Sequence, residues 1–181
     1  MARAVVLLRG VNVGGRNMIR MPVLTGLLEG LGCTDVVTYL QSGNAVVTAP
    51  LRPADLEAAV REALVQTGLD VRVMVRTARD LDAVVAGTPF PDADPKLLHV
   101  AFLSGDPIAV PEATAPEAVV AGPARSLYVH YANGVHGSKL ALTDRKLGVA
   151  ATARNWTTVL ALQSLLRGEG QTPTAEKPPS T

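Results

Sequence analysis

Two stretches of the sequence combine glycines with arginine and amide side chains. The first, Arg9–Asn17, reads RGVNVGGRN and follows an apolar run. Glycines let backbone N–H groups approach an anion, and guanidinium groups bind phosphate or carboxylate through paired hydrogen bonds. The second, Gln41–Asn44, reads QSGN and offers two amides and a hydroxyl. Both stretches indicate binding of negative charge or, alternatively, turns that use glycine and carry solvated polar side chains.

A third polar stretch, ATARNWTT at Ala151–Thr158, is interpreted as the start of a helix. Arg154 would then lie near the positive end of the helix dipole, which costs about 0.3–1 kcal/mol. An anion bound at the same place would offset that cost. The alternative is a solvated arginine with Asn155 or Thr152 as the helix cap. A further helix start is expected at GSKL, with Ser138 as cap and Lys139 beside it.

None of these three stretches contains an aspartate or a glutamate. A paired-carboxylate hydrolase or a two-metal phosphoryl-transfer site requires such acids. We therefore expect a cradle for an anion that has no evident general base, no metal and no cofactor. His130 and His136 are expected to face each other across a hairpin, but no further ligand residue joins them.

Composition places the chain among globular proteins. Of its 181 residues, 48% are hydrophobic and 18% charged, which suits one domain or two small ones with a sizeable core. No apolar run approaches the roughly 20 residues of a membrane span. The single cysteine, Cys33, excludes an internal disulfide, and a cytoplasmic protein is expected. Residues 1–28 carry four arginines and no acid, and residues 123–168 carry six bases and one acid. If the fold joins these two basic blocks, they form one positive surface.

The first 76 residues predict a ferredoxin-like unit. Apolar periodicity and turn residues indicate, in order, strand, helix, strand, strand, helix and strand. The first strand, Ala4–Arg9, does not alternate and is expected to be buried on both faces, with the second half of the chain as its cover. The last, Val71–Arg76, alternates and is expected to have one wet face. The expected strands lie at 4–9, 35–41, 44–49 and 71–76, and the helices at 21–31 and 52–69.

Residues 77–167 predict a second, less regular unit of the same kind. The pattern indicates a helix at 78–86, a strand at 97–103, an irregular segment up to residue 122 and a strand at 127–131. A return strand after the turn at Ala132–Gly134 and helices near 139–147 and 155–166 complete it. Residues 168–181 are predicted to be a disordered tail. The fold class is therefore α+β, with two tandem ferredoxin-like (split βαβ) units packed together, although the halves show no evident sequence repeat.

The topology makes a geometric prediction about the first two polar stretches. In a split βαβ sheet with strand order 4-1-3-2, the end of strand 1 and the hairpin between strands 2 and 3 lie at the same edge. Arg9–Asn17 should therefore lie beside Gln41–Asn44.

Several motifs resemble one known family. The run LLRGVNVGGRNMIRMPVLTGLLEGLGCTDVVTYLQSGNAVV, together with HVAFLSG, GSKL and ATARNWTTVLAL, is similar to the bacterial family called domain of unknown function 1697. The resemblance implies two ferredoxin-like units in tandem and no established activity. Cys33 stands where that family tends to have an aromatic residue, and we interpret it as a small buried hydrophobe.

The favoured hypothesis is binding of a small ligand that bears phosphate or carboxylate. The cradle would combine Arg9–Asn17, Gln41–Asn44 and the segment around Arg154. Alternatives are an enzyme, a transferase or hydrolase, that uses the same cradle; contact with a nucleic-acid backbone; or a purely structural protein. Base stacking is disfavoured because the expected central strands carry no aromatic residue. The candidate ligand-binding residues are Arg9, Asn12, Gly14, Gly15, Arg16, Asn17, Gln41, Ser42, Asn44, Lys139, Arg154 and Asn155.

Overall fold

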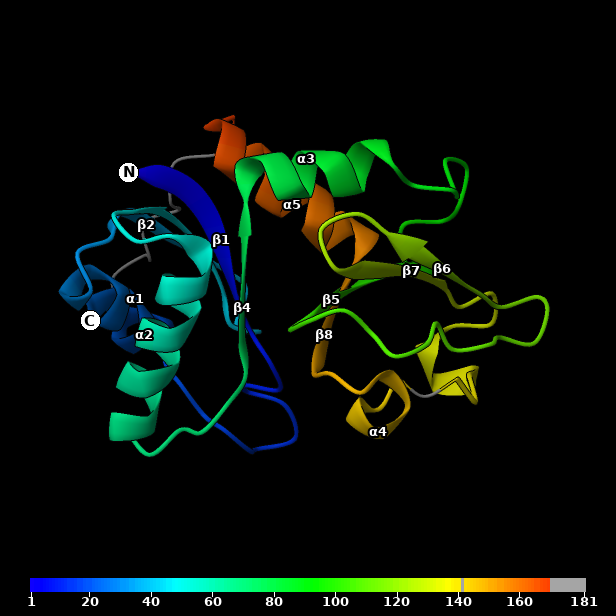
Figure 1. Cartoon of the computed structure of the whole chain (residues 1–181), viewed down its shortest axis with the longest axis horizontal. Helices are drawn as coiled ribbons and strands as arrows, with labels where there is room; N and C mark the ends of the chain where they lie inside the picture. The colour runs from blue at the N-terminus through cyan, green and yellow to red at the C-terminus, as the bar shows by residue number, and fades with distance from the viewer. Residues whose placement is uncertain (141, 170–181) are drawn as a thin grey trace, which may run out of the picture.

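The computed structural model describes residues 1–140 and 142–169 and contains two four-stranded antiparallel sheets (Figure 1). The first sheet has the strand order β2-β3-β1-β4. Its elements follow the ferredoxin-like sequence predicted for the first half of the chain. They are β1 (Ala2–Leu8), α1 (Met21–Gly30), β2 (Thr34–Tyr39), β3 (Asn44–Ala49), α2 (Pro53–Gln66) and β4 (Val73–Thr77).

The second sheet repeats this order, as β6-β7-β5-β8. Its strands are β5 (Leu98–Leu103), β6 (Ala118–Gly122), β7 (Ser126–His130) and β8 (Ala151–Asn155). The connections are less regular than in the first unit, as predicted. Residues 104–117 form no helix, and the described residues between β7 and β8 form only a 3-10 turn (Val135–Gly137) and the short α4 (Asp144–Leu147).

Two helices lie where the units meet. α3 (Ala78–Ala86) and α5 (Trp156–Arg167) follow β4 and β8 directly and run side by side across the top of the molecule in Figure 1. The Thr77–Asp80 capping box starts α3, and the Asn155 side chain caps α5. Their apolar faces pack against both sheets in one central core. That core includes Val5, Leu7, Leu81, Val84, Val100, Phe102, Val159 and Leu162.

β1 is consequently buried on both faces, as its sequence predicted. Val6 and Leu8 pack under α1 and α2, whereas Val5 and Leu7 pack into the central core. Cys33 is buried among the residues beneath α1, as expected, and burial raises the pKa of its thiol.

Five sequence-based expectations are wrong. β4 has no wet face, because the second unit covers the side of the strand that carries Arg76. The sequence predicts irregular chain where β6 lies and the start of a helix where β8 lies. Both are short strands that gain their order from pairing with β7 and β5. The chain after β7 forms a 3-10 turn and no return strand, so His130 and His136 do not lie on paired strands. The helix expected over 139–147 is confined to α4.

The boundary between the two units after residue 76 remains a prediction. Gly168 ends α5 in the left-handed conformation, with φ of 74°. Most of the tail predicted at 168–181, from residue 170 on, lies outside the described residues. Among the described helices, none has the length and apolar character needed to cross a membrane.

Candidate functional site

The first two polar stretches meet at one edge of the first sheet, as the topology predicted. Leu7 pairs with Asn44 across β1 and β3. Beyond the strand, the Leu8 amide donates to the Gly43 carbonyl at 2.8 Å, and Asn12 Nδ2 donates to the Gln41 carbonyl at 2.6 Å. The hairpin and the β1–α1 loop are therefore held together directly.

Most polar side chains in the β1–α1 loop shape the loop itself. Asn12 Nδ2 also donates to the Ile19 carbonyl, and its Oδ1 accepts from the Ile19 amide, each at 2.8 Å. Asn17 Nδ2 donates to the Gly10 carbonyl at 3.1 Å. Asn12 and Asn17 also adopt positive φ, which asparagine tolerates better than most residues. Their amides close the loop.

The two adjacent glycines form the tip of a small hairpin. Gly14 and Gly15 have φ of 59° and 72°. Val13 and Arg16 pair on either side of them. This is the backbone of a two-residue turn that requires positive φ at both positions. The turn explains the glycines without a ligand, and it leaves Arg16 exposed.

Arg154 reaches this edge from the second unit, from strand β8 and not from a helix start. Its guanidinium makes five hydrogen bonds, which engage all the donors that an arginine side chain has. It donates from Nε to Asn44 Oδ1 at 2.5 Å and from Nη2 to the Leu8 and Ser42 carbonyls at 2.8 and 3.1 Å. Nη1 donates to Thr152 Oγ1 and to the Ala153 carbonyl, each at 2.8 Å.

These contacts change the role expected of Arg154. No guanidinium hydrogen is left for a ligand. Removal of the group from water lowers its pKa to about 10. The amide of Asn44 is equally engaged, because Nδ2 donates to the Tyr39 carbonyl and to Ser42 Oγ. Asn155 caps α5 by accepting from the Thr158 amide at 2.9 Å. All these groups hold the edge together.

An acid also reaches the edge, although the polar stretches contain none. Arg9 Nη1 donates to Asp144 Oδ2 of α4 at 2.7 Å. That hydrogen bond is the main reason why the pKa of the Asp144 carboxyl lies below its usual value, and the positive charge of Arg72 adds to it. Arg9 is thus already paired with an acid, which α4 supplies from outside the three polar stretches.

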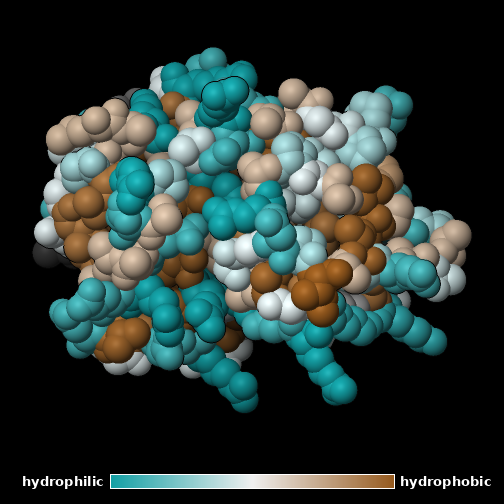
Figure 2. Space-filling model, in the orientation of Figure 1, coloured by the Kyte–Doolittle hydropathy of each residue, from teal (hydrophilic) through white to brown (hydrophobic). Residues whose placement is uncertain are grey.

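The two basic blocks of the sequence do come together here. Arg9 belongs to the first block, and Asp144 and Arg154 belong to the second. Figure 1 places the β1–α1 loop and α4 along the lower edge, and Figure 2 shows hydrophilic side chains gathered along the same edge.

Beside this edge lies a surface hollow of about 580 Å³, here called the Arg20 hollow. Arg20 and Gln41 supply its polar side chains together with the engaged Asn12. Among the described residues, neither the Arg20 guanidinium nor the Gln41 side-chain amide has a hydrogen-bond or ion-pair partner. The lining is Asn12, Met18, Ile19, Arg20 and Gln41. A neighbouring hollow of about 660 Å³, along α1 and β2, shares Gln41 and contains Glu29.

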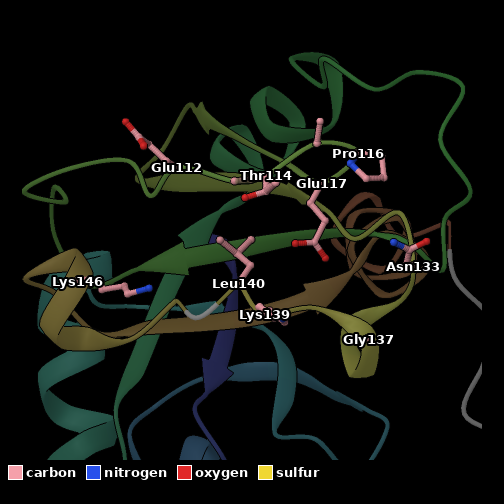
Figure 3. Close-up of a pocket in the computed structure, with 11 residues that line it drawn as sticks. Glu112, Thr114, Pro116, Glu117, Asn133, Gly137, Lys139, Leu140 and Lys146 are labelled. Atoms are coloured by element: carbon pink, nitrogen blue, oxygen red, sulfur yellow. The ribbon is translucent and has the colours of Figure 1, made fainter.

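Lys139 lies elsewhere. It lines a different hollow on the outer side of the second sheet (Figure 3). Ser138 caps no helix there; its Oγ accepts from the Leu140 amide. His99 stands on β5 with its ring edge-on to Tyr131, and its buried Nδ1 lacks a partner among the described residues.

Sequence reasoning missed Arg76. Its side chain is 2% exposed. Its guanidinium donates to the carbonyls of Val75, Leu103, Ala124 and Arg125 at 2.6–3.2 Å. Burial lowers its pKa to about 10. The alternation in VRVMVR pointed to solvent at this position, and only the packing of the second unit reverses it.

Comparison with known proteins bears on the family and the fold. The sequence model of a family described as "Protein of unknown function (DUF1697)" matches residues 1–126. The chain belongs to this family. The matched region ends before GSKL and ATARNWTTVLAL, two of the blocks that carried the resemblance. No curated protein matches the sequence.

One solved structure is similar across nearly the whole DUF1697 chain. It is described as a conserved bacterial protein, SP0830, from Streptococcus pneumoniae. The two are 20% identical, with a TM-score of 0.73, and the similarity covers 91% of this chain and 98% of the other. At that identity the likeness supports the fold alone.

Proposed function

We propose that this DUF1697 protein binds a small ligand bearing phosphate or carboxylate in the Arg20 hollow. The observation that carries the proposal is which side chains of the hollow have hydrogen-bond or ion-pair partners. Arg20 and Gln41 line the hollow with no partner among the described residues, whereas the side chains of Asn12, Asn44 and Arg154 beside it are engaged. A volume of about 580 Å³ suits a small metabolite.

The start of α1 supports an anionic ligand. Arg20 is the N-cap residue, its side chain makes no capping bond, and the first turn of the helix has no acid. Helix N-termini favour negative charge through the helix dipole. At α1 the dipole is the main contribution, because Pro22 has no N–H and the Val23 and Leu24 amides donate to the Arg20 carbonyl. The exposed Arg16 of the adjacent hairpin adds a second cation at the rim.

This proposal differs from the cradle expected from sequence. Arg154, Asn44 and Asn12 hold the site in shape and are not ligand contacts, because their hydrogen-bonding groups are occupied. Arg9 is paired with Asp144. We propose binding, without catalysis, because none of the five residues that line the hollow is a general base.

Contact with a nucleic-acid backbone is the competing proposal for the basic edge. The sheet face on which related RNA-binding folds stack bases is covered in the first unit by the central core. Only phosphate contacts would remain, and such binding falls steeply as salt increases.

Thermal-shift measurements test both proposals. The probes are inorganic phosphate, a panel of phosphorylated and carboxylated metabolites, and a short single-stranded RNA, each at low and high salt. We expect a saturable rise in Tm with at least one small anion that persists at high salt, is lost in Arg20→Gln and Gln41→Ala, and is retained in Arg79→Gln. Arg79 is an exposed arginine of α3 and is the matched control.

Two outcomes would overturn small-anion binding. One is the absence of stabilisation by any small anion. The other is an equal loss in Arg79→Gln, which would mean that net charge alone matters. Stabilisation by RNA that vanishes at high salt would favour backbone contact.

A further inference from the structure

The outer face of the second sheet lacks the cover that the first sheet has. In the first unit, α1 and α2 bury the outer face under a large apolar cluster. In the second unit the corresponding connections are residues 104–117 and the short α4 region. The apolar cluster there is smaller and is built around Ala101, Leu103, Leu127, Val129, Tyr131 and Leu147. Where helices would pack, the chain instead encloses a hollow of about 410 Å³, here called the Glu117 hollow.

The lining of the Glu117 hollow carries both negative and positive side chains. Glu117 comes from the segment before β6, whereas Lys139 and Lys146 come from the chain between β7 and β8. Figure 3 shows the Glu117 carboxylate directed into the hollow toward Leu140, with Lys146 entering from the other side and Asn133 at the far end. Glu112 also belongs to the lining, but Figure 3 shows its carboxylate directed away from the hollow. Within the described part of the chain, none of these four charged side chains forms an ion pair.

A polar row continues from this wall across the sheet. Ala118 pairs with His130, so Glu117 stands opposite Tyr131 at the next position. The pKa of Tyr131 is raised, first by burial and then by the negative charge of Glu117. The His99 ring lies 5.2 Å from the Tyr131 ring, centroid to centroid, and its buried Nδ1 has no partner among the described residues. Glu117, Tyr131 and His99 therefore form a polar end on an otherwise apolar face of the sheet.

We propose that the Glu117 hollow binds a small zwitterion of the size of an amino acid. Its ammonium group would pair with Glu117, its anionic group with Lys139 and Lys146, and its aliphatic part would lie on Leu140. A zwitterion fits because the hollow offers both charges, neither of them in an ion pair, and a ligand with one charge would use only one of them. The site is separate from the Arg20 hollow and shares no lining residue with it.

Two-dimensional NMR of the histidine ring nitrogens, with thermal shift in parallel, tests the site. The full chain is titrated with the common amino acids and, separately, with ethylammonium and with acetate at the same millimolar concentrations. We expect at least one amino acid to raise Tm and to shift the His99 ring signals, with no such effect from either single-charge probe. Glu117→Gln should weaken binding about tenfold or more, since it removes a charged hydrogen-bond partner.

Glu62→Gln, an exposed glutamate of α2, is the matched control and should bind like the parent. No change in the His99 signals with any amino acid would overturn the proposal, as would an equal response to ethylammonium alone or an equal loss in Glu62→Gln. Glu117→Gln reports on this hollow and Arg20→Gln on the Arg20 hollow, and the two share no lining residue, so either proposal can fail without the other.

Discussion

Arg76 and Arg154 occupy equivalent positions in the two units, and each holds the opposite unit. Each arginine is the fourth residue of the fourth strand of its sheet. Each directly precedes the residue that caps the next helix, Thr77 for α3 and Asn155 for α5. The two side chains therefore leave their own sheets at corresponding points.

Their acceptors correspond as well. Arg76 donates to the carbonyl of Leu103, the last residue of β5, and Arg154 donates to that of Leu8, the last residue of β1. Arg76 also reaches the β6–β7 turn at Ala124, and Arg154 reaches the β2–β3 turn at Ser42. The exchange is reciprocal, so the two units are related by an approximate two-fold arrangement.

Loss of either arginine should destabilise the whole chain. We expect Arg154→Met and Arg76→Met each to lower the free energy of unfolding by about 2–4 kcal/mol, because several buried carbonyls lose a charged donor. A lysine at either position should recover little, since one ammonium group cannot reach the same spread of acceptors. Urea unfolding measures both effects. Arg79→Met is the control, and unfolding midpoints that match it would contradict the role assigned to the pair.

Gly43 should tolerate no side chain. It has φ of 74°, and a Cβ there would meet Leu8 Cβ at 2.8 Å as well as Val11. We expect Gly43→Ala to cost about 2–4 kcal/mol, from backbone strain together with overpacking. Gly14→Ala separates the two terms, because Gly14 has φ of 59° and open space around it. It should cost only about 1–2 kcal/mol. Equal decreases in the free energy of unfolding of the two variants, measured by chemical denaturation, would show that the close approach at Gly43 does not contribute.

The Arg9–Asp144 ion pair should affect the acid titration of the Asp144 carboxyl. The pKa of Asp144 lies below its ordinary value of 3.8, chiefly through its hydrogen bond from Arg9. A carboxyl with a lowered folded-state pKa contributes stability that is present above the ordinary pKa and is lost as pH falls through the folded-state pKa. Carbon-detected NMR titration should find the pKa of Asp144 higher in Arg9→Ala than in the parent. It should be unchanged in Arg61→Ala, and an unchanged pKa in Arg9→Ala would refute the assignment.

Tyr128 should contribute a buried hydrogen bond between β7 and α3. Its hydroxyl donates to the Val84 carbonyl at 2.7 Å, and burial raises the pKa of the phenol. We expect Tyr128→Phe to lower the unfolding free energy by about 1–2 kcal/mol, because the carbonyl loses its donor in a buried place. Tyr39→Phe is the control, since no hydrogen bond of the Tyr39 hydroxyl is present among the described residues. A loss in Tyr128→Phe no larger than that in the control would contradict this view.

The sequence by itself determined the first unit and the meeting of its two polar stretches. Unbroken apolar runs such as Ala4–Leu8 identify a strand buried on both faces, and the order of elements then places the β1–α1 loop beside Gln41–Asn44. These features are local, or follow from topology, and so they can be read along the chain.

Only the tertiary structure decided which polar groups are free. Arg154 looked like a ligand residue and is saturated by carbonyls of the other unit, whereas Arg76 looked solvated and is buried. β6 and β8, with the sequences AVVAG and ATARN, are rich in alanine and show no clear strand pattern, and they gain their order from their neighbours. The physical reason is common to all of these cases. The pairing and burial of a side chain depend on groups far away in the sequence, and neither composition nor spacing carries that information.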